Sequence, residues 1–582
     1  MNYRLVIYGL LVWGVLFALL QIGFQYHFYY IEQSQLFLFS QAYVEGKLFQ
    51  VGGVADLLSE YLVQFFIHPY AGAAIVSGLL VAIGMTLWGV LKRIGVTHFQ
   101  YAWPLIPLLA LLFMHLDACY RLQGTVSYLF MLLLLLGYLK VAHPLCRLLL
   151  GLVMIPLLFW IGGSISFLFA LLLVGFEVVR KNPKWYLSFI GVAEAFMLAV
   201  FSVYAAWVGE FRLALLPDLY YHHKLVPPSI IYLSWGVLPC IFLIAFLLER
   251  WGAVWKGWKY GGGYLLLFLL IGTLGTWGIL RYGDLKMLKL KELDYYARTG
   301  QWEQTIAACQ GKLTNYLYVC HLNMALANQG KLLDEMFHYN QMGIEGLIVP
   351  WNKQENVSCL LSDVYFTMGA IASSQEMAFE AYVSAMGEGS PRMLKRLVQT
   401  NLIYGAYPVA EKYIALLEKS HGYREWASSQ RRFLYQEEEL LADPLLGGRK
   451  QMLPRLNTLT VLMDLADELE HLLENGTGNR ASLQYLGAIY LLSKNLEKFK
   501  ILVEKYYGTE VLPALPVHFQ EAVIVLSEKD PDYWKRFGLS EAIVSRFAEY
   551  KKQVLANRNN SAVAGLLNRA YGNTYWFYYM FK

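Results

Sequence analysis

Two carboxylates are the first candidates for chemistry in this sequence. Glu32 follows the aromatic run Tyr29-Tyr30-Ile31 just beyond the first long apolar segment, and Asp117 follows the third such segment. A carboxylate among aromatic groups at a membrane surface can accept a proton from an acceptor hydroxyl or bind a divalent metal such as Mg²⁺ or Mn²⁺. The alternatives are a solvated interfacial side chain for Glu32 and a helix-end ion pair with Arg121 for Asp117.

A group of cations lies on the loop between the seventh and eighth apolar segments. It consists of Arg212, His222, His223 and Lys224. Cationic donors clustered beside a membrane suit a lipid phosphate or pyrophosphate. We expect Arg121 on the same outer surface. The alternative for the whole group is an ordinary interfacial anchor.

Two further ionisable residues stand near these groups in the predicted arrangement. Glu194 lies near the middle of the apolar segment 186–208, where a charge is costly and usually has a partner or a purpose. It is interpreted as a proton-relay group or as a structural hydrogen-bonding residue. His68 precedes Pro69 at the end of a long loop, and it either faces the same pocket or serves as a capping residue.

Composition and motifs exclude several classes of function. The 582 residues are 57% hydrophobic and only 16% charged, which is typical of a membrane protein. The six cysteines form no CxxC or metal-ligand spacing, and no basic stripe of the nucleic-acid-binding kind appears. Phosphate-binding glycine loops, serine-hydrolase elbows and zinc-protease motifs are absent from the sequence. Nucleic acid is therefore not an expected partner.

The elements that must position these groups are membrane helices. A span needs about 20 mostly apolar residues, and apolar runs of this kind fill the chain up to residue 283. The nine predicted segments are 5–24, 70–91, 101–116, 125–141, 144–161, 164–179, 186–208, 229–248 and 264–280. The long loop 25–69 between the first two is predicted to form two short helices along the membrane surface, broken at Gly52-Gly53.

Loop charges predict the orientation of these segments. Lys and Arg recur on one side if nine spans alternate, whereas loop 25–69 on the other side is acidic. The positive residues are Arg4, Lys92, Arg93, Lys140, Arg147, Arg180, Lys181, Lys184, Arg250, Lys256 and Lys259. Because cytoplasmic loops are enriched in positive charge, the amino terminus is predicted to be inside and residues 284–582 outside.

The second half has the pattern of stacked helical hairpins. Small residues at predicted turns, chiefly Gly300, Gly330 and Gly405, are followed by a large residue and then by small residues on the next helix. Weaker copies cover 365–381 and 483–506. The pattern is similar to tetratricopeptide repeats, whose period is about 34 residues. The aromatic terminus 570–582 is predicted to fold back onto the membrane domain or the bilayer surface.

The layout resembles the GT-C superfamily of glycosyltransferases that use polyprenyl-phosphate sugars. Tyr30-Ile31-Glu32-Gln33 stands where such enzymes carry an acid in the first outer loop, and Gln33 replaces the second acid of the usual pair. The resemblance implies that Glu32, helped by Asp117 or a metal, is catalytic. It also implies that a protein or glycan acceptor is presented by the repeats. The whole chain resembles a family of Bacteroidetes inner-membrane proteins without an established activity.

The sequence therefore predicts an all-α protein with a polytopic membrane domain, residues 1–283, and a periplasmic helical-repeat domain, residues 284–582. A lipid-phosphate-dependent glycosyltransferase in a bacterial inner membrane is the first functional hypothesis. A membrane-anchored repeat scaffold and a lipid or solute transporter built round Glu194 stay open as alternatives.

Overall fold

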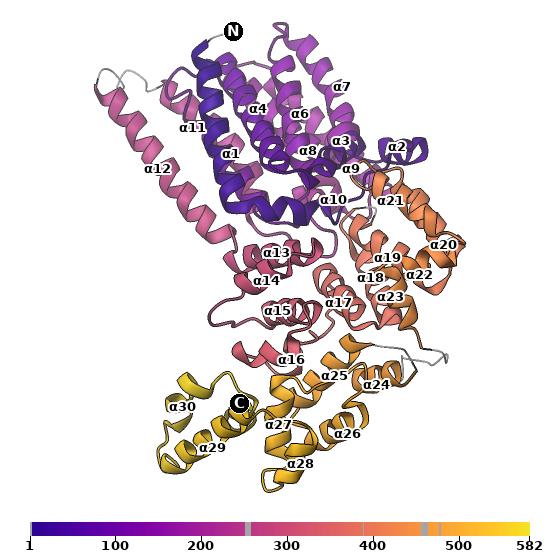
Figure 1. Ribbon diagram of the computed structural model, residues 1–582. Coiled ribbons are helices and arrows are strands. Elements are labelled where there is room, and N and C mark those ends of the chain that lie inside the picture. The colour runs from indigo at the N-terminus through magenta and orange to yellow at the C-terminus, as the bar shows by residue number, and fades with distance from the viewer. Residues whose placement is uncertain (1–2, 251–257, 388, 455–463, 476–478) are drawn as a thin grey trace. The chain divides into compact units, whose positions relative to one another are not determined.

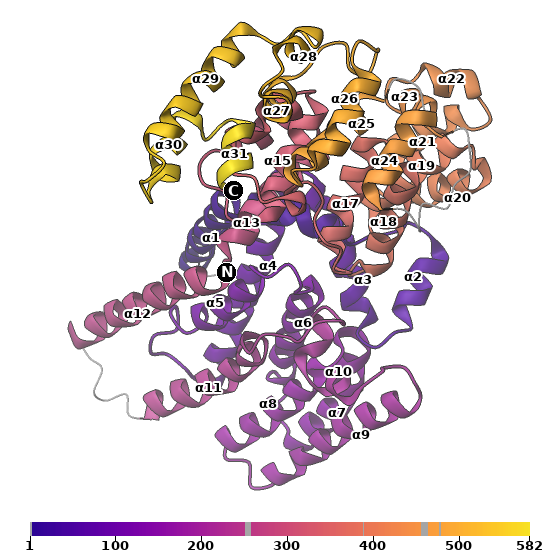
Figure 2. The same cartoon turned by 90° about the horizontal axis from the view of Figure 1, so that it is seen from below.

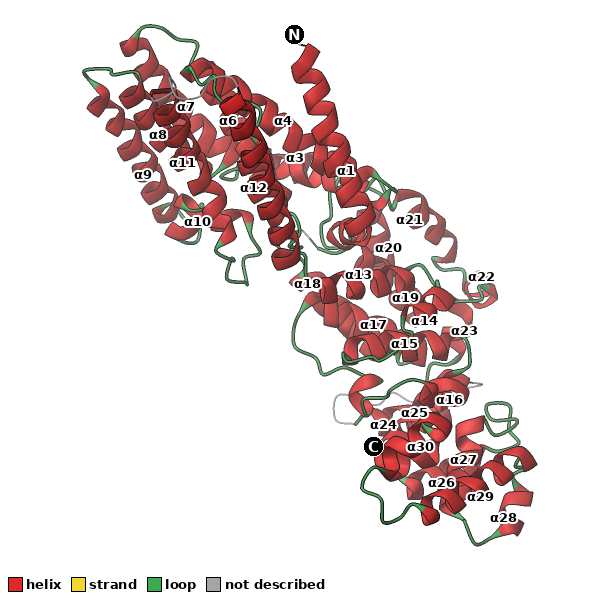
Figure 3. Cartoon of the chain, turned by 90° about the vertical axis from the view of Figure 1, so that its left-hand side faces the viewer, coloured by secondary structure: helices red, strands yellow, loops and turns green. Residues whose placement is uncertain are grey.

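The fold is helical throughout the part of the chain that the structure describes. The structure is a computed structural model that describes residues 3–250, 258–387, 389–454, 464–475 and 479–582. Within these residues it contains helices, loops and two isolated β-bridges, and no strand (Figures 1 and 3). The predicted all-α fold class is confirmed.

Two compact units make up the chain. The first contains Met1–Lys289 together with two later segments, Met386–Gly389 and Glu418–Arg424. The second contains Leu290–Ala385, Ser390–Leu417 and Glu425–Lys582. Parts of the second half of the sequence thus belong to the unit that is built from the apolar half.

The first unit contains an apolar helix at each of the nine predicted segments. These helices are α1 (Tyr3–Glu32), α4 (Ala71–Ile94), α5 (Leu105–Met114), α6 (Leu122–Tyr138), α7 (Pro144–Gly162), α8 (Ile165–Val179), α9 (Phe189–Tyr204), α11 (Ile230–Arg250) and α12 (Trp258–Tyr282). Six are long and apolar enough to cross a membrane, whereas α5, α6 and α8 are shorter. The helices are therefore compatible with a multi-pass membrane protein, and nine crossings stay a prediction.

Helix α1 is divided by a kink that separates its apolar part from its polar end. Phe24 has φ −138° and ψ 21°, which lie outside the helical region. The part before the kink is about 31 Å long at 1.5 Å per residue, close to the thickness of a bilayer core. The part after the kink carries His27 and Glu32, both buried. The kink therefore separates Glu32 from the apolar part of the helix, and its position relative to a membrane stays a prediction.

Loop 25–69 contains the two predicted helices, α2 (Gln41–Leu48) and α3 (Gly53–Val63), followed by the 3-10 helix η1 (Gln64–Ile67). Gly52 breaks them with a left-handed φ of +72°. A Cβ on Gly53 would lie 1.9 Å from the Lys47 carbonyl oxygen, so only glycine allows this close turn. Helix α3 packs on α6 and α7. The predicted break is confirmed, and contact of these helices with a membrane surface stays a prediction.

The second unit is built from helical hairpins at the predicted places. The pairs are α13 (Leu285–Arg298) with α14 (Trp302–Ala308), α15 (Tyr316–Asn328) with α16 (Leu332–Glu335), α17 (Glu355–Met368) with α18 (Ile371–Ser384), α19 (Pro391–Tyr404) with α20 (Tyr407–Leu417), and α25 (Arg480–Leu492) with α26 (Leu496–Tyr506). Each turn contains a left-handed residue, namely Gly300, Gly330, Gly369, Gly405 or Lys494. Their assignment to tetratricopeptide repeats stays a prediction.

Shorter helices complete both units. In the first unit α10 (Phe211–Leu215) follows α9. Those that lie in or enter the second unit are α21 (Arg424–Gln430), α22 (Glu437–Ala442), α23 (Leu446–Gln451), α24 (Leu465–Asn475), α27 (Val517–Leu526), α28 (Pro531–Arg536), α29 (Glu541–Ala556), α30 (Val563–Tyr571) and α31 (Tyr575–Phe581).

The aromatic carboxyl terminus is buried inside the second unit. Helix α31 packs on α27 (Figure 2), and the Tyr575 amide donates to Glu521 Oε2 at 2.7 Å. The Tyr578 hydroxyl donates to the Leu492 carbonyl at 3.1 Å, and the side chain of Trp576 is only 2% exposed. The prediction that this segment folds onto the membrane domain or the bilayer is wrong, because α27 and its neighbours supply the apolar cover.

Candidate functional site

The structure brings two of the predicted site segments together. The turn 115–121 and the loop 217–228 are joined by an antiparallel bridge between Tyr120 and Tyr221. The Arg121 amide donates to the Tyr220 carbonyl at 2.9 Å, and the His222 amide donates to the Cys119 carbonyl at 3.0 Å. This pairing brings the turn that contains Asp117 and Arg121 next to the loop that contains His222, His223 and Lys224.

Asp117 lies in this turn and is held by two donors. Its Oδ1 accepts from the Cys119 amide at 2.9 Å, and its Oδ2 accepts from the Tyr221 hydroxyl at 2.7 Å. Residues 115–121 form no helix, so Asp117 and Arg121 do not share a helix face as an i, i+4 pair. Asp117 as a whole residue is half-buried.

Arg121 continues from this turn into a buried group of charges. Its Nη2 lies 2.5 Å from Asp56 Oδ1 and 3.7 Å from Glu60 Oε1, both on α3. Lys47 on α2 lies 2.8 Å from Asp56 Oδ2 and 3.0 Å from Glu60 Oε1. The Tyr43 hydroxyl also donates to Glu60. Two acids and two bases thus form a balanced charge quartet, Lys47–Asp56–Glu60–Arg121.

The pKa values of the two acids in the quartet are shifted in opposite directions. Burial raises the pKa of Asp56, but the charges of Arg121 and Lys47 outweigh burial and hold this pKa below its ordinary value. Burial and then the charge of Asp56 raise the pKa of Glu60, more than Lys47 and Arg121 lower it. Glu60 is therefore the first acid of the pair to take up a proton, and Asp56 is the one held ionised.

Glu32 lies in the part of the first unit that contacts the two late segments of the chain. Its side chain is 2% exposed, and its Oε1 accepts from the Tyr423 hydroxyl at 2.7 Å. The Gly387 amide donates to the Ser34 carbonyl at 3.2 Å. A Cβ built on Gly387 would stand 3.5 Å from Glu60 Oε1. The alternative of a solvated interfacial Glu32 is therefore wrong, because the chain covers it.

His68 lies near one of the late segments but has no contact with Glu32 or the charge quartet among the hydrogen bonds and ion pairs of the described residues. Its imidazole ring lies 5.8 Å from that of His421, which also contacts the Phe65 ring at 5.3 Å. His68 is exposed, and these ring contacts fit a packing role better than a role in the interior. The contact of His68 with His421 joins residues far apart in the sequence, so the sequence around His68 could not predict it.

The structure brings only some of the predicted cationic residues close together. His222 and His223 stack with their rings 5.0 Å apart. Burial, followed by the charges of Lys224 and Arg121, lowers the pKa of His223. Arg212 instead binds Asp218 Oδ1 at 2.6 Å, and Tyr232 donates to the same oxygen at 3.0 Å. Lys224 is therefore the exposed cation of this loop, whereas Arg121 and Arg212 each form ion pairs with acids.

Glu194 does not belong to this group. It lies on α9, within a candidate span, and its buried Oε2 has no hydrogen-bond partner among the described residues. No polar contact recorded between described residues links it to the turn 115–121 or to the loop 217–228. Glu194 is therefore separate from the other predicted site residues, on a helix that is long and apolar enough to cross a membrane.

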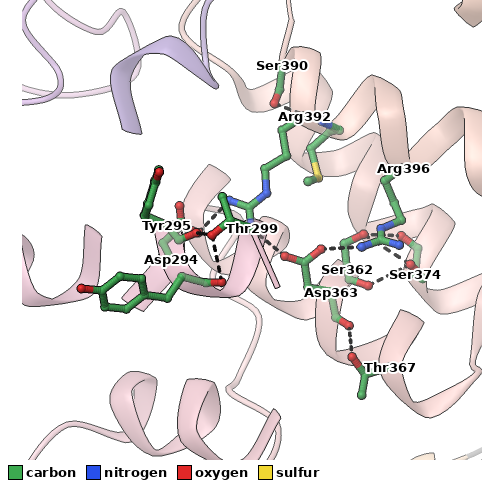
Figure 4. Close-up of polar contacts among 12 residues, drawn as sticks. Asp294, Tyr295, Thr299, Ser362, Asp363, Thr367, Ser374, Ser390, Arg392 and Arg396 are labelled. Carbon is green, nitrogen blue, oxygen red and sulfur yellow. Dashed lines mark hydrogen bonds and ion pairs between the residues drawn. The ribbon is translucent and has the colours of Figure 1, made fainter. Parts of the chain in front are cut away.

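Two further buried ion-pair networks, besides the charge quartet, were not predicted from the sequence. Arg147 Nε lies 2.7 Å from Glu177 Oε1, and Tyr138 donates to the same oxygen at 3.0 Å. An acid inside the apolar segment 164–179 was the available signal for this pair. In the second unit, the guanidinium of Arg392 lies between Asp294 and Asp363 at 2.7 and 2.6 Å (Figure 4).

The second network ties three helices of the second unit. Asp294 lies on α13, Asp363 on α17, and Arg392 and Arg396 on α19 (Figure 4). Arg396 lies 2.8 Å from Asp363 Oδ1. Burial opposes ionisation of Asp363, but Arg392 and Arg396 lower its pKa below the ordinary value. The i, i+4 spacing of the two arginines on α19 was a signal for one shared carboxylate partner.

The expected divalent metal has no ligand set in the described part of the chain. No group of three or more His, Cys, Asp or Glu side chains among these residues is arranged to hold a metal ion. Glu32 and Asp117 each accept a tyrosine hydroxyl instead of sharing a centre. Glu32 and Asp117 therefore do not fit a shared metal site, and no step of the proposed reaction involves a metal.

Comparisons with known proteins give one match. A family model described as "Family of unknown function (DUF6057)" matches residues 1–582. No curated protein matches the chain, and neither does any solved structure.

Proposed function

We propose a function for this chain, which belongs to the DUF6057 family: it is a membrane transferase that takes a sugar from a lipid-phosphate donor. The observation that supports this best is the bridge between Tyr120 and Tyr221. It joins the turn that holds the half-buried carboxylate of Asp117 and the guanidinium of Arg121 to the loop that carries His223 and the cation Lys224. A carboxylate next to an anion-binding face is what transfer from a phosphate leaving group requires.

The proposed reaction uses only residues of this face. The donor phosphate binds at Lys224, whose positive charge matches its negative charge, and at the N–H groups of Arg121 and His223. The acceptor hydroxyl oxygen then bonds to the anomeric carbon, and the bond from that carbon to the phosphate oxygen breaks. The lipid phosphate leaves with the electron pair, and Asp117 takes the hydroxyl proton. Tyr221, which donates to Asp117 Oδ2, orients the carboxylate.

Burial gives Glu32 a different role in this proposal from the catalytic one that the resemblance implies. Its carboxylate accepts from Tyr423 of the late segment 418–424, and the nearby Ser34 carbonyl accepts from the Gly387 amide of the other late segment. We assign it as a positioning residue that fixes these segments beside Gln35 and the charge quartet. Asp117, the more accessible acid, is the proposed base.

The contact between Glu32 and Tyr423 also supports the proposed sidedness. Two residues that share a hydrogen bond lie on the same side of the membrane, so the chain crosses an even number of times between them. Eight of the described apolar helices, α4 to α12 without the short α10, lie between these two positions. This arrangement supports nine crossings, with loop 25–69 and residues 418–424 in one compartment.

The substitution Asp117→Asn tests the proposed base. We expect donor cleavage to fall ~100-fold or more, because a general base contributes about that much. Purified full-length protein would be mixed with a radiolabelled polyprenyl-phosphate hexose and acceptor-bearing membranes from cells lacking this chain. Asp532→Asn, at an exposed site in the second unit, is the control. Unchanged cleavage in Asp117→Asn would refute the assignment.

Phosphate binding can be measured separately from turnover. Lys224→Gln is expected to weaken binding of polyprenyl phosphate in neutral vesicles by about tenfold, which corresponds to the loss of ~1.4 kcal/mol. Lys184→Gln, on a loop predicted to face the opposite side, serves as the control. Equal binding by both variants would contradict the placement of the phosphate.

A second function is favoured by the hairpins of the second unit. Stacked helical pairs form extended surfaces that bind peptides, and the described hairpins are joined by tight left-handed turns. In this alternative the chain is a membrane-anchored scaffold. The native chain and the Asp117→Asn variant would then capture the partner equally well, and neither would cleave a lipid-linked sugar, whereas the transferase requires Asp117.

A further inference from the structure

An apolar groove runs between α1 and α4, at the end of α1 opposite to Glu32. It has a volume of about 360 Å³ and is lined mainly by Gly9, Leu10 and Trp13 of α1 and by Gly78, Val81 and Met85 of α4. Gly78 borders open space, since a Cβ on it would meet no atom within 4 Å. The groove lies on two helices that are long and apolar enough to span a membrane, so its natural surroundings are hydrocarbon.

A smaller cavity adjoins the groove and is lined in part by a tryptophan. This cavity shares Gly9, Val81 and Met85 with the groove and reaches Leu5 and Trp88. The Trp88 indole N–H is buried and has no hydrogen-bond partner among the described residues. A buried donor without an acceptor is costly, so a ligand that brings an acceptor oxygen to this point would be favoured.

Positive charge surrounds the same end of the groove. The Lys92 ammonium lies 5.0 Å from the centroid of the Trp88 ring, and Arg93 follows in the last turn of α4. Arg4 lies next to Leu5, which lines the cavity together with Trp88. All three cations are exposed, so they can meet an anionic group that enters from the bilayer.

We propose that this groove is a binding site for an anionic phospholipid of the surrounding bilayer. One acyl chain fills the space between α1 and α4, and the Trp88 N–H donates to an ester carbonyl. The phosphate lies at Lys92 with Arg4 and Arg93 near it. A helix of a second copy would fill the apolar part but would bring neither the acceptor nor the negative charge. The site does not depend on the proposed transferase activity, because it uses none of those residues.

A photoreactive lipid tests the occupant directly. Full-length protein would be placed in phosphatidylcholine vesicles containing a phosphatidylglycerol analogue with a diazirine in its acyl chain, irradiated, digested and analysed by mass spectrometry. We expect labelling to concentrate on residues 6–13 and 78–88. Gly78→Leu should reduce this labelling by about tenfold, since a leucine side chain occupies the groove and excludes ligand atoms.

Matched variants separate loss of the site from loss of folding. Gly175→Leu on α8 is the control, because a Cβ there also meets no atom within 4 Å and the position is exposed. Labelling by the phosphatidylglycerol probe should stay unchanged in this control. Trp88→Phe and Lys92→Gln should each lower the preference for the phosphatidylglycerol probe over a phosphatidylcholine probe by about fivefold.

Three results would overturn the proposal. The first is equal labelling of Gly78→Leu and the native chain, both with unchanged melting temperature. The second is equal labelling by the two probes in the native chain. The third is a native dimer that Gly78→Leu converts to a monomer, since the occupant would then be a second copy.

Discussion

At the scale of single residues, the charge quartet Lys47–Asp56–Glu60–Arg121 joins two helices and a turn through buried ion pairs. Each member faces opposite charges at hydrogen-bonding distance, and the three on α2 and α3 are nearly inaccessible to water. A buried charge that loses its partner costs far more than an exposed pair contributes. The quartet therefore constrains α2, α3 and the turn before α6 to one arrangement.

Lys47→Met should destabilise the first unit by about 3–5 kcal/mol at neutral pH, because two buried acids then share one counter-charge. In the native chain the lowered pKa of Asp56 contributes stability that is present above its unfolded pKa and lost as pH falls through the folded value. In the variant, protonation relieves repulsion between the acids, so the deficit should shrink on acidification. Thermal unfolding in detergent between about pH 4 and 8 measures both effects.

The control for Lys47→Met is Lys535→Met, which removes an exposed ion pair with Asp532. This variant should leave the melting temperature nearly unchanged at every pH. A Lys47→Met chain as stable as the native one at neutral pH would show that the quartet does not hold α2 in place.

At the scale of elements, the turn between α2 and α3 decides whether the quartet can form. Gly53→Ala should destabilise the chain by about 1–3 kcal/mol, since the new methyl group would overlap the Lys47 carbonyl and push α2 away from α3. Gly46→Ala is the matched control within α2, where a Cβ meets no atom within 4 Å and alanine favours helix. Equal melting temperatures for the two variants would contradict this account.

Elements were more predictable than the site because their signals are local. Apolar runs of helical length predict α1, α4 and α7, and Gly300 and Gly405 mark hairpin turns through their own conformational freedom. The contacts of the site are not local. Arg121 and Asp56 are 65 positions apart, and Glu32 and Tyr423 are 391 apart. No periodicity encodes such pairings, so Asp56, Glu60 and Tyr423 were missed as partners.

At the scale of the whole molecule, the composition of the aromatic terminus predicts that it is buried but not which surface covers it. Seven aromatic residues in 571–582 indicate burial correctly, and Tyr575, Trp576 and Phe577 are indeed buried. Composition does not reveal the covering surface, which is formed by α27 and by residues such as Phe547 and Tyr550 on α29.

Deletion of residues 575–582 should destabilise the second unit by at least about 5 kcal/mol, since burial of one Trp or Phe is worth ~3–5 kcal/mol. Hydrogen exchange should show faster exchange in α27, α29 and α30, with α4 and α6 unchanged. Deletion of residues 580–582 alone, which are largely exposed, is the control. Unchanged exchange in α27 after the longer deletion would contradict the observed docking.

The two late segments of the first unit have a consequence for biosynthesis. The Phe39 amide donates to the Lys419 carbonyl, the Gly387 amide to that of Ser34, and the Tyr423 hydroxyl to Glu32. While the ribosome is still translating the intervening codons, loop 25–69 has already emerged but lacks these partners. The apolar half therefore reaches its finished form only after residue 424 has been made, so a nascent chain halted earlier would expose Glu32 and its neighbours to quality-control proteases.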